Sequence, residues 1–203
     1  RGAEGFVDAL FRSGAGAGER SVRGSLDRQL QQDASTLMAS TVARWRARGA
    51  SNGAAVVLAN GTGEVLAYVA AADPAGPGGA LDLLRAPRQP GSTLKTFVYS
   101  LLFERGATPM TVMADVQVPL RGAHGETAEA RDYDGMERGP VAARDALASS
   151  LNLAALDAAT RVGAAPIVQR MRALGINVPR EADHYGPGIV LGGLDVAPLA
   201  LAH

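Results

Sequence analysis

The sequence predicts an α+β fold in which a short antiparallel sheet packs against a group of helices. The sheet is indicated by two apolar, β-branched runs within Ala54–Ala71, which flank the turn sequence Asn-Gly-Thr-Gly at 60–63. The helices are indicated by apolar residues that recur at helical spacing, mostly after residue 92. Because both strands are apolar at nearly every position, we expect the hairpin to be central and covered on both faces.

The composition is that of a folded protein without excess charge. The chain has 203 residues, 47% of them hydrophobic and 20% charged, which is enough for one domain with a substantial core. Its 20 basic and 20 acidic residues cancel, and this argues against nucleic acid as the main partner, because phosphate binding needs a positive excess. With no cysteine, disulfides, thiolate catalysis and cysteine-ligated metal sites are excluded.

Residues 1–25 are predicted to be a linker or the end of an upstream region. The run Ser13–Arg20 is rich in glycine and alanine and has no apolar periodicity, so we expect order to begin near Leu26. No run approaches the roughly 18 consecutive apolar residues of a membrane span, and the first residues lack the apolar core of a secretory signal. We therefore expect any targeting segment to lie elsewhere or to be missing.

Apolar spacing and stop signals place the remaining elements. A helix is predicted from Asp27 to Arg48, where Gly49 ends the pattern, and a second from Ser92 to Gly106. The loop-like residues 72–91 separate them. After residue 107 the chain predicts a short strand at Val116–Leu120, and helices at Val141–Ala148, Asn152–Val162, Pro166–Leu174 and, capped by Asp195, around Leu199 and Leu201.

The only lysine of the chain, Lys95, lies three residues after Ser92. On a helix this spacing puts both side chains on one face, with Ser92 near the N-terminus, where the dipole favours negative charge. A serine becomes a nucleophile when a base removes its proton, and a neutral lysine is such a base once its pKa falls from about 10.4 towards 7–8. The alternative is that Ser92 only caps the helix and Lys95 is solvated.

A second polar pair, Ser150 and Asn152, flanks Leu151 at the predicted junction of two helices. A hydroxyl and an amide that point together into a cleft can relay a proton and hold a substrate amide. The alternative is that Ser149 or Ser150 caps the second helix. Because both motifs occur in order, each at a helix start, we interpret them as functional rather than structural.

Other polar residues have simpler interpretations. The three histidines, at positions 124, 184 and 203, are far apart and lack a helical pair spacing, so no metal site is predicted from them. Tyr133–Gly135 is predicted to be a loop. The acidic residues are scattered, and no pair resembles the two carboxylates of a glycosidase.

The segments around these motifs resemble the transpeptidase domain of class A penicillin-binding proteins, and within that family the 1C type most of all. RQPGSTLKTFVYSLLFERG is similar to its active-serine segment, and RDYDGMERGPVAARDALASSLNLAAL to the stretch that leads into its Ser-X-Asn motif. SLDRQLQQ, NGTGEVLAYVAAAD and HYGPGIVLGGLDVAPLALA also match, so the resemblance runs from about Ser25 to His203.

The resemblance implies a penicillin-binding-protein transpeptidase or serine β-lactamase-like fold, and a peptidoglycan D,D-transpeptidase that β-lactams acylate. Ser92 would be the acyl-enzyme nucleophile and Lys95 its base. Ser150 would pass the proton to the leaving D-alanine, and Asn152 would bind the donor peptide, a stem ending in D-Ala-D-Ala. In this family the Tyr133–Gly135 loop would border the cleft. The backbone N–H of Ser92 would be one oxyanion donor, and no metal or organic cofactor is expected.

One departure from the family pattern limits these expectations. The third motif, Lys-Thr-Gly, is absent, since no lysine follows Lys95. We therefore expect residues 26–203 to be a partial transpeptidase domain whose C-terminal strands lie beyond His203. The alternatives are a catalytically silent penicillin-binding or scaffold fragment, and a D,D-carboxypeptidase or β-lactamase-like hydrolase. The resemblance also implies an upstream glycosyltransferase domain, a membrane anchor and a periplasmic location at the inner membrane.

Overall fold

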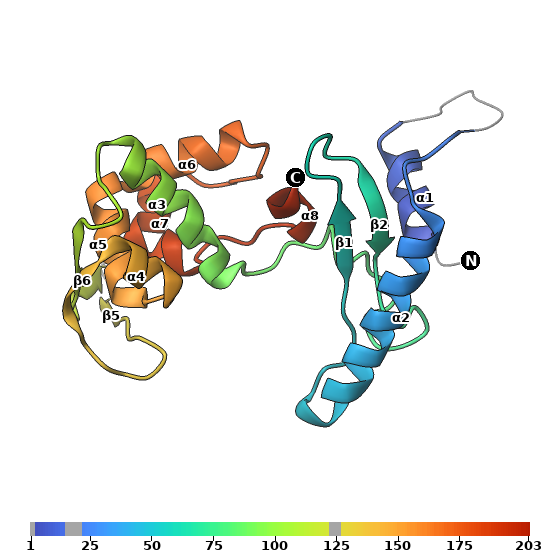
Figure 1. The fold of residues 1–203 in the computed structure, drawn as a ribbon, viewed down its shortest axis with the longest axis horizontal. Helices are drawn as coiled ribbons and strands as arrows, with labels where there is room; N and C mark the ends of the chain where they lie inside the picture. The colour runs from blue at the N-terminus through green and yellow to red at the C-terminus, as the bar shows by residue number, and fades with distance from the viewer. Residues whose placement is uncertain (1–2, 15–21, 122–126) are drawn as a thin grey trace. The chain divides into compact units, whose positions relative to one another are not determined.

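The computed structural model describes residues 3–14, 22–121 and 127–203, and they form two compact units (Figure 1). The first unit runs to Pro87 and also includes Ala197–His203, while the second is Arg88–Val196. Helices, a hairpin and two smaller antiparallel sheets make up the described chain, so the predicted mixture of helices and antiparallel strands is confirmed. No helix in the described part of the chain has the length and hydropathy of a membrane span.

The first unit is built on the predicted hairpin. Strands β1 (Ala55–Leu58) and β2 (Val65–Val69) pair antiparallel, with Ala55 opposite Val69. Helix α2 (Arg28–Trp45) contacts β2; its N-terminus is capped by Asp27, whose carboxylate accepts the Leu30 N–H at 2.7 Å.

The expectation that both faces of the hairpin are covered is only partly met. The last three residues of β2 are buried, but all four residues of β1 are only half-buried. Among the described residues, α2 and α1 (Glu4–Arg12) pack on β2, whereas the short helix α8 (Pro198–Ala202) is the helix that contacts β1.

Helix α1 occupies a segment for which we predicted no element. Phe6, on its inner face, is buried and packs edge-on against Tyr68 of β2, with ring centroids 6.2 Å apart. Order therefore begins well before Leu26, because one aromatic anchor holds the helix to the hairpin. Residues 15–21 of the expected linker lie outside the described residues, and the boundary at residue 25 stays a prediction.

The second unit is a group of helices around α5 (Asn152–Val162), whose predicted bounds are confirmed. Seven of its eleven residues are buried, four of them alanines, which allows the neighbouring helices to approach closely. Helix α5 contacts the other elements of this core, namely α3 (Lys95–Glu104), α4 (Ala143–Ala148), α6 (Ala164–Ala173) and the 3₁₀ segment Gly186–Leu191, while α7 (Ala182–Tyr185) packs on α6 (Figure 1).

Two small sheets differ from the sequence prediction. β3 (Val112–Asp115) pairs with β6 (Gly139–Ala142), and β4 (Pro119–Arg121) pairs with β5 (Thr127–Glu129). The strand predicted at 116–120 is therefore wrong over 116–118, which join β3 to β4. The helix predicted from Val141 begins two residues later, because pairing with β3 holds 139–142 in an extended conformation.

The last predicted helix, α8, forms without the expected cap. Its N-cap position is Ala197 rather than Asp195. The chain between them is extended, since Val196 exchanges two backbone hydrogen bonds with Arg88, at 2.9 and 3.1 Å. These two hydrogen bonds join the first and last residues of the second unit. They keep Val196 extended, so α8 begins after it rather than at Asp195.

Candidate active site

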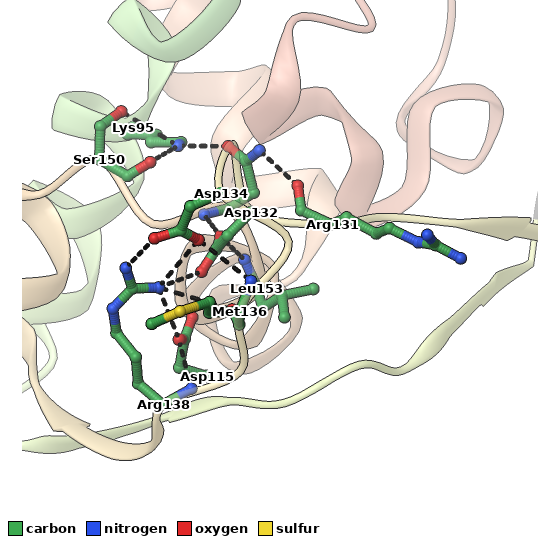
Figure 2. Close-up of polar contacts among 10 residues, drawn as sticks. Lys95, Asp115, Arg131, Asp132, Asp134, Met136, Arg138, Ser150 and Leu153 are labelled. Carbon is green, nitrogen blue, oxygen red and sulfur yellow. Dashed lines mark hydrogen bonds and ion pairs between the residues drawn. The ribbon is translucent and has the colours of Figure 1, made fainter.

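Three of the four predicted site residues meet at one point of the second unit (Figure 2). The Lys95 Nζ donates to the backbone oxygen of Ser150 at 2.6 Å and to Asn152 Oδ1 at 2.7 Å, and lies 3.2 Å from Ser150 Oγ. Lys95 is the first residue of α3 and is only 1% exposed. The alternative of a solvated lysine is therefore wrong.

The surroundings of Lys95 favour its neutral form. Burial lowers the pKa of Lys95 below its ordinary value, because desolvation disfavours the ammonium, while the negative charge of Asp132 acts in the opposite direction. A neutral lysine has two N–H groups, enough for the two carbonyl oxygens nearest to it. Its lone pair is then available to the hydroxyl proton of Ser150, so Ser150 and Lys95 can exchange a proton directly.

Ser150 has a backbone conformation that serines rarely adopt. Its φ is +53°, the only positive φ of a non-glycine residue in the described chain. The Ser150 N–H donates to Leu147 O and the Leu151 N–H to Ala146 O, both at 3.0 Å. These are the two hydrogen bonds of a Schellman motif at the end of α4, in which Ser150 takes the position usually given to glycine.

This left-handed turn presents Ser150 to Lys95 through both its backbone oxygen and its hydroxyl. The conformation costs roughly 1–2 kcal/mol relative to glycine. Strain of this kind persists where the surroundings over-determine the geometry, as they do at functional sites.

Asn152 is fixed at both ends of its amide. Its Oδ1 accepts from Lys95, and its Nδ2 donates to the backbone oxygen of Arg131 at 2.8 Å. The two partners settle the orientation of the amide, since only the oxygen can accept an N–H of Lys95. The Oδ1 atom retains a second lone pair, with which it can accept a further N–H.

Ser92 differs from the other three residues. It lies in the 3₁₀ turn Gly91–Leu94, directly before α3, and not in the first turn of an α-helix as predicted. Its backbone oxygen accepts the Lys95 N–H, so the two residues are one turn apart. Its side chain is exposed, and its hydroxyl forms no hydrogen bond to any residue that the structure describes.

The turn that carries Ser92 rests on a second glycine segment. Gly192 has a φ of +96°, and a Cβ at this position would lie 2.8 Å from the Gly91 nitrogen. The backbones of the two segments therefore touch, and only glycine fits there. No local feature of the sequence predicts this contact between Gly192 and the turn of Ser92.

A carboxylate that the sequence analysis did not select holds the start of α5. Asp132 Oδ1 accepts the backbone N–H of Asn152 and, at 3.2 Å, that of Leu153. Its Oδ2 faces Arg138 Nη1 at 3.2 Å. Asp132 lies in an irregular loop, and nothing local in the sequence distinguishes it from its neighbour Asp134.

A second buried carboxylate, Asp115 at the end of β3, lies behind Asp132. Its Oδ2 accepts the Arg138 N–H at 3.0 Å, and its Oδ1 has no hydrogen-bond partner among the described residues. Burial raises the pKa of Asp115, and the neighbouring Asp132 carboxylate raises it further, against the effect of the backbone donor of Arg138.

The other residues named from the sequence are Tyr133 and the three histidines. Tyr133 lies in a turn, as predicted, and is fully exposed; with Arg138 and Ser149 it lines a cavity of about 200 Å³ that adjoins Ser150. His184 stacks edge-on against Tyr185, and His203 belongs to the first unit. His124 lies outside the described residues.

Comparison with known proteins gives the family of this chain. Residues 53–187 match the family described as penicillin binding protein transpeptidase domain. The chain belongs to this family. It is 35% identical over 135 residues to penicillin-binding protein 1A of Rickettsia bellii, and 32% identical over 121 residues to penicillin-binding protein 1A of Neisseria gonorrhoeae. These alignments cover 62% and 59% of this chain but only 16% and 15% of those relatives.

Solved structures share the fold at low sequence identity. The penicillin V complex of PonA1 from Mycobacterium tuberculosis matches 98% of this chain and 56% of its own, with a TM-score of 0.72 and 20% identity. The imipenem acyl-enzyme complex of penicillin-binding protein A from the same organism matches 99% and 55%, with a TM-score of 0.72 and 22% identity. Penicillin-binding protein 1A from Haemophilus influenzae matches 74% and 22%, with a TM-score of 0.65 and 22% identity.

Proposed function

We propose that this chain carries the acylation site of a peptidoglycan D,D-transpeptidase of the class A type. The observation that carries the proposal is the buried Lys95, which is bonded to Ser150 and Asn152 one turn after the exposed Ser92. A buried lysine with a lowered pKa next to a hydroxyl is suited to act as a general base.

In the proposed reaction, Ser92 Oγ attacks the carbonyl carbon between the two D-alanines of a stem peptide. Its proton passes to Lys95, either directly or through the hydroxyl of Ser150. The resulting oxyanion is stabilised by the backbone N–H of Ser92. When the intermediate collapses, the peptide C–N bond breaks and the leaving D-alanine takes the proton from Ser150, which leaves an acyl ester on Ser92.

Transfer to the acceptor reverses the same proton path. The amine of a neighbouring stem attacks the ester carbonyl, its proton returns through Ser150 and Lys95 to Ser92 Oγ, and the peptide crosslink forms. Asn152 Oδ1 would accept the backbone N–H of the donor peptide. A β-lactam would undergo the acylation step alone: Ser92 Oγ would attack its carbonyl carbon, and the C–N bond of the lactam ring would break.

A second candidate function is silent binding without acylation. It is favoured by the exposed Ser92 hydroxyl, which forms no hydrogen bond to Lys95, Ser150 or any other residue that the structure describes. A carboxypeptidase or β-lactamase reaction has less support, because we assign no residue here to activate the deacylating water.

The location, the wider protein and the ligands are proposals based on the family resemblance. They are a periplasmic location at the inner membrane, a parent protein with a membrane anchor and an upstream glycosyltransferase domain, and substrates and inhibitors that are stem peptides and β-lactams. The 1C type is also a proposal, whereas the relatives named above are 1A proteins. No nucleic-acid partner is proposed.

The test is intact-mass spectrometry of the chain after incubation with benzylpenicillin. We expect a single covalent adduct in the wild-type chain and none in Ser92→Ala. Ser100→Ala is the matched control, because Ser100 lies on α3 as well and its hydroxyl only bonds to Phe97 O. An adduct that survives Ser92→Ala would disprove the nucleophile, and a folded wild-type chain without any adduct would favour the silent alternative.

A further inference from the structure

Helix α5 begins without a cap of its own. Its N-cap residue is Leu151, whose side chain cannot accept a hydrogen bond, so the first N–H groups of the helix need another partner. Asp132 supplies it from a loop about twenty residues earlier, by accepting from both Asn152 and Leu153. A carboxylate is favoured at this position, because the N-terminal end of a helix carries partial positive charge.

The capped residues are the ones that surround Lys95. Asn152 is the first residue of α5, and Ser150 stands two residues before it in the strained turn. A shift at the start of α5 would therefore move two acceptors of Lys95 at once. The loop also binds the side chain of Asn152, since the backbone oxygen of Arg131 accepts its Nδ2–H.

Asp132 is itself held in place by Arg138. The Nη1 atom of Arg138 lies 3.2 Å from Asp132 Oδ2 and 3.7 Å from Asp115 Oδ2, while the Arg138 backbone N–H donates to Asp115 at 3.0 Å (Figure 2). Asp115 and Asp132 are both almost fully buried. The carboxylate of Asp132 is thus held by Arg138 and can keep the start of α5 in one position.

We infer that Asp132 is a positioning residue of the active site, which caps α5 from a separate loop and thereby fixes Asn152 and Ser150 around Lys95. The inference rests on the function proposed above for Ser92 and Lys95. Asp132 acts through Asn152 and through its charge, without a role in bond making or breaking.

The test compares the rate of acylation by benzylpenicillin in Asp132→Ala, Asp132→Asn and the wild-type chain. We expect Asp132→Ala to acylate about 10–100-fold more slowly, because the start of α5 loses its acceptor and Asn152 is no longer held. Asp132→Asn should recover part of this loss, since its amide oxygen can still accept from the helix.

Asp157→Asn is the matched control. Asp157 also lies on α5, accepts the Ala114 N–H at 2.8 Å and pairs with Arg161 at 2.6 Å, so its loss weakens the fold without reaching Lys95. We expect this variant to melt at a lower temperature but to acylate with the wild-type pH profile.

The pH profile separates positioning from general structural support. A base must be neutral, so the rate falls as the pH drops through the pKa of Lys95. The charge of Asp132 raises that pKa, and its removal should move the acidic limb of the profile to lower pH in both Asp132 variants. Other charged groups on the helices that pack against α3 are paired with residues other than Lys95: Asp157 with Arg161, Arg170 with Glu104, Arg172 with Glu181, and Arg144 with Asp145.

The inference is overturned if folded Asp132→Ala acylates at the wild-type rate and the acidic limb of its pH profile lies where it does in wild type. If Asp132→Ala does not fold, Asp132→Asn decides on the same two readouts. If the wild-type chain forms no adduct, the proposed function fails separately, and the positioning role is read from the side-chain ¹⁵N resonance of Lys95. A lower titration midpoint in Asp132→Asn then supports the inference, and an unchanged midpoint overturns it.

Discussion

The two serines of the proposed site are held in opposite ways. Ser150 is fixed by its backbone and its side chain, in a left-handed turn that faces Lys95. Ser92 lies on a 3₁₀ turn, is exposed, and has a hydroxyl without a hydrogen bond to the described residues. The base side of the site, formed by Lys95, Ser150 and Asn152, is thus assembled before any substrate binds, while the proposed nucleophile Ser92 remains accessible.

This difference fits the chemistry expected of each group. A relay between two proton-carrying atoms needs a fixed distance, and the strained turn together with the cap on α5 provides one. An attacking oxygen must instead reach a carbonyl carbon that enters from solvent. We therefore expect changes on the base side to alter rates and pKa values, and changes near Ser92 to act through the position of its turn.

The largest effect is expected for Lys95→Met. Methionine keeps much of the buried stem but removes the base, so acylation by benzylpenicillin should slow by about 10²–10⁴-fold. The rate is measured by intact mass over time, with a melting curve to verify the fold. If the folded variant were acylated at the wild-type rate, Lys95 would not be the base.

The next largest effect is expected for Gly192→Ala, which tests the nucleophile side. Its Cβ would lie 2.8 Å from the Gly91 nitrogen, at a φ of +96°. We expect a loss of roughly 2–3 kcal/mol of unfolding free energy, together with slower acylation, because the Ser92 turn is displaced. Gly188→Ala is the control, since nothing lies within 4 Å of the added Cβ. Equal effects of the two substitutions in urea denaturation would contradict the close contact.

Ser150→Gly should separate stability from activity. Glycine adopts the left-handed conformation without strain, so the unfolding free energy should rise by about 1 kcal/mol. Part of this gain is offset, because glycine has more conformational entropy in the unfolded chain. Acylation should slow, because the hydroxyl of the relay is lost. Ser150→Ala is expected to slow acylation without the gain. If Ser150→Gly were no more stable than Ser150→Ala in urea denaturation, the turn would not be strained.

The smallest effect is expected for Asp115→Asn and concerns pH. A carboxyl whose pKa is raised on folding stabilises the fold at pH values below its unfolded pKa, near 3.8, and this contribution is lost as the pH rises through the folded pKa. The amide lacks this titration and can still accept from the Arg138 N–H. The unfolding free energy of the variant minus that of wild type should therefore be larger at pH 7 than at pH 4. A difference in stability that does not change between pH 4 and pH 7 would contradict the raised pKa.

Local signals in the sequence were sufficient for some of these features. Helix α5 was predicted with its observed bounds, because its apolar residues are periodic and Gly163 ends it. The hairpin was predicted from its turn residues. Lys95, Ser150 and Asn152 were brought together by family resemblance and by their positions at helix starts, and the structure joins them by hydrogen bonds.

Features that depend on distant contacts were missed. The second half of β6, residues 141–142, was assigned to a helix because its pairing with β3 leaves no local signal, and α1 was missed because its anchor is Tyr68, about sixty residues away. Asp132 was missed for the same reason, since its partners lie in α5. The departure at Ser150 is different in kind: glycine is the residue expected in that turn, and the proposed relay would account for the serine.

The most direct measurement is the pKa of Lys95 in the wild-type chain. Because the sequence contains one lysine, a sample labelled with ¹⁵N-lysine gives a single side-chain nitrogen resonance, whose shift can be followed against pH. The account predicts a midpoint below the ordinary lysine value of 10.5, because burial outweighs the charge of Asp132. A midpoint at or above 10.5 would make Lys95 a permanent cation and would contradict its role as the base.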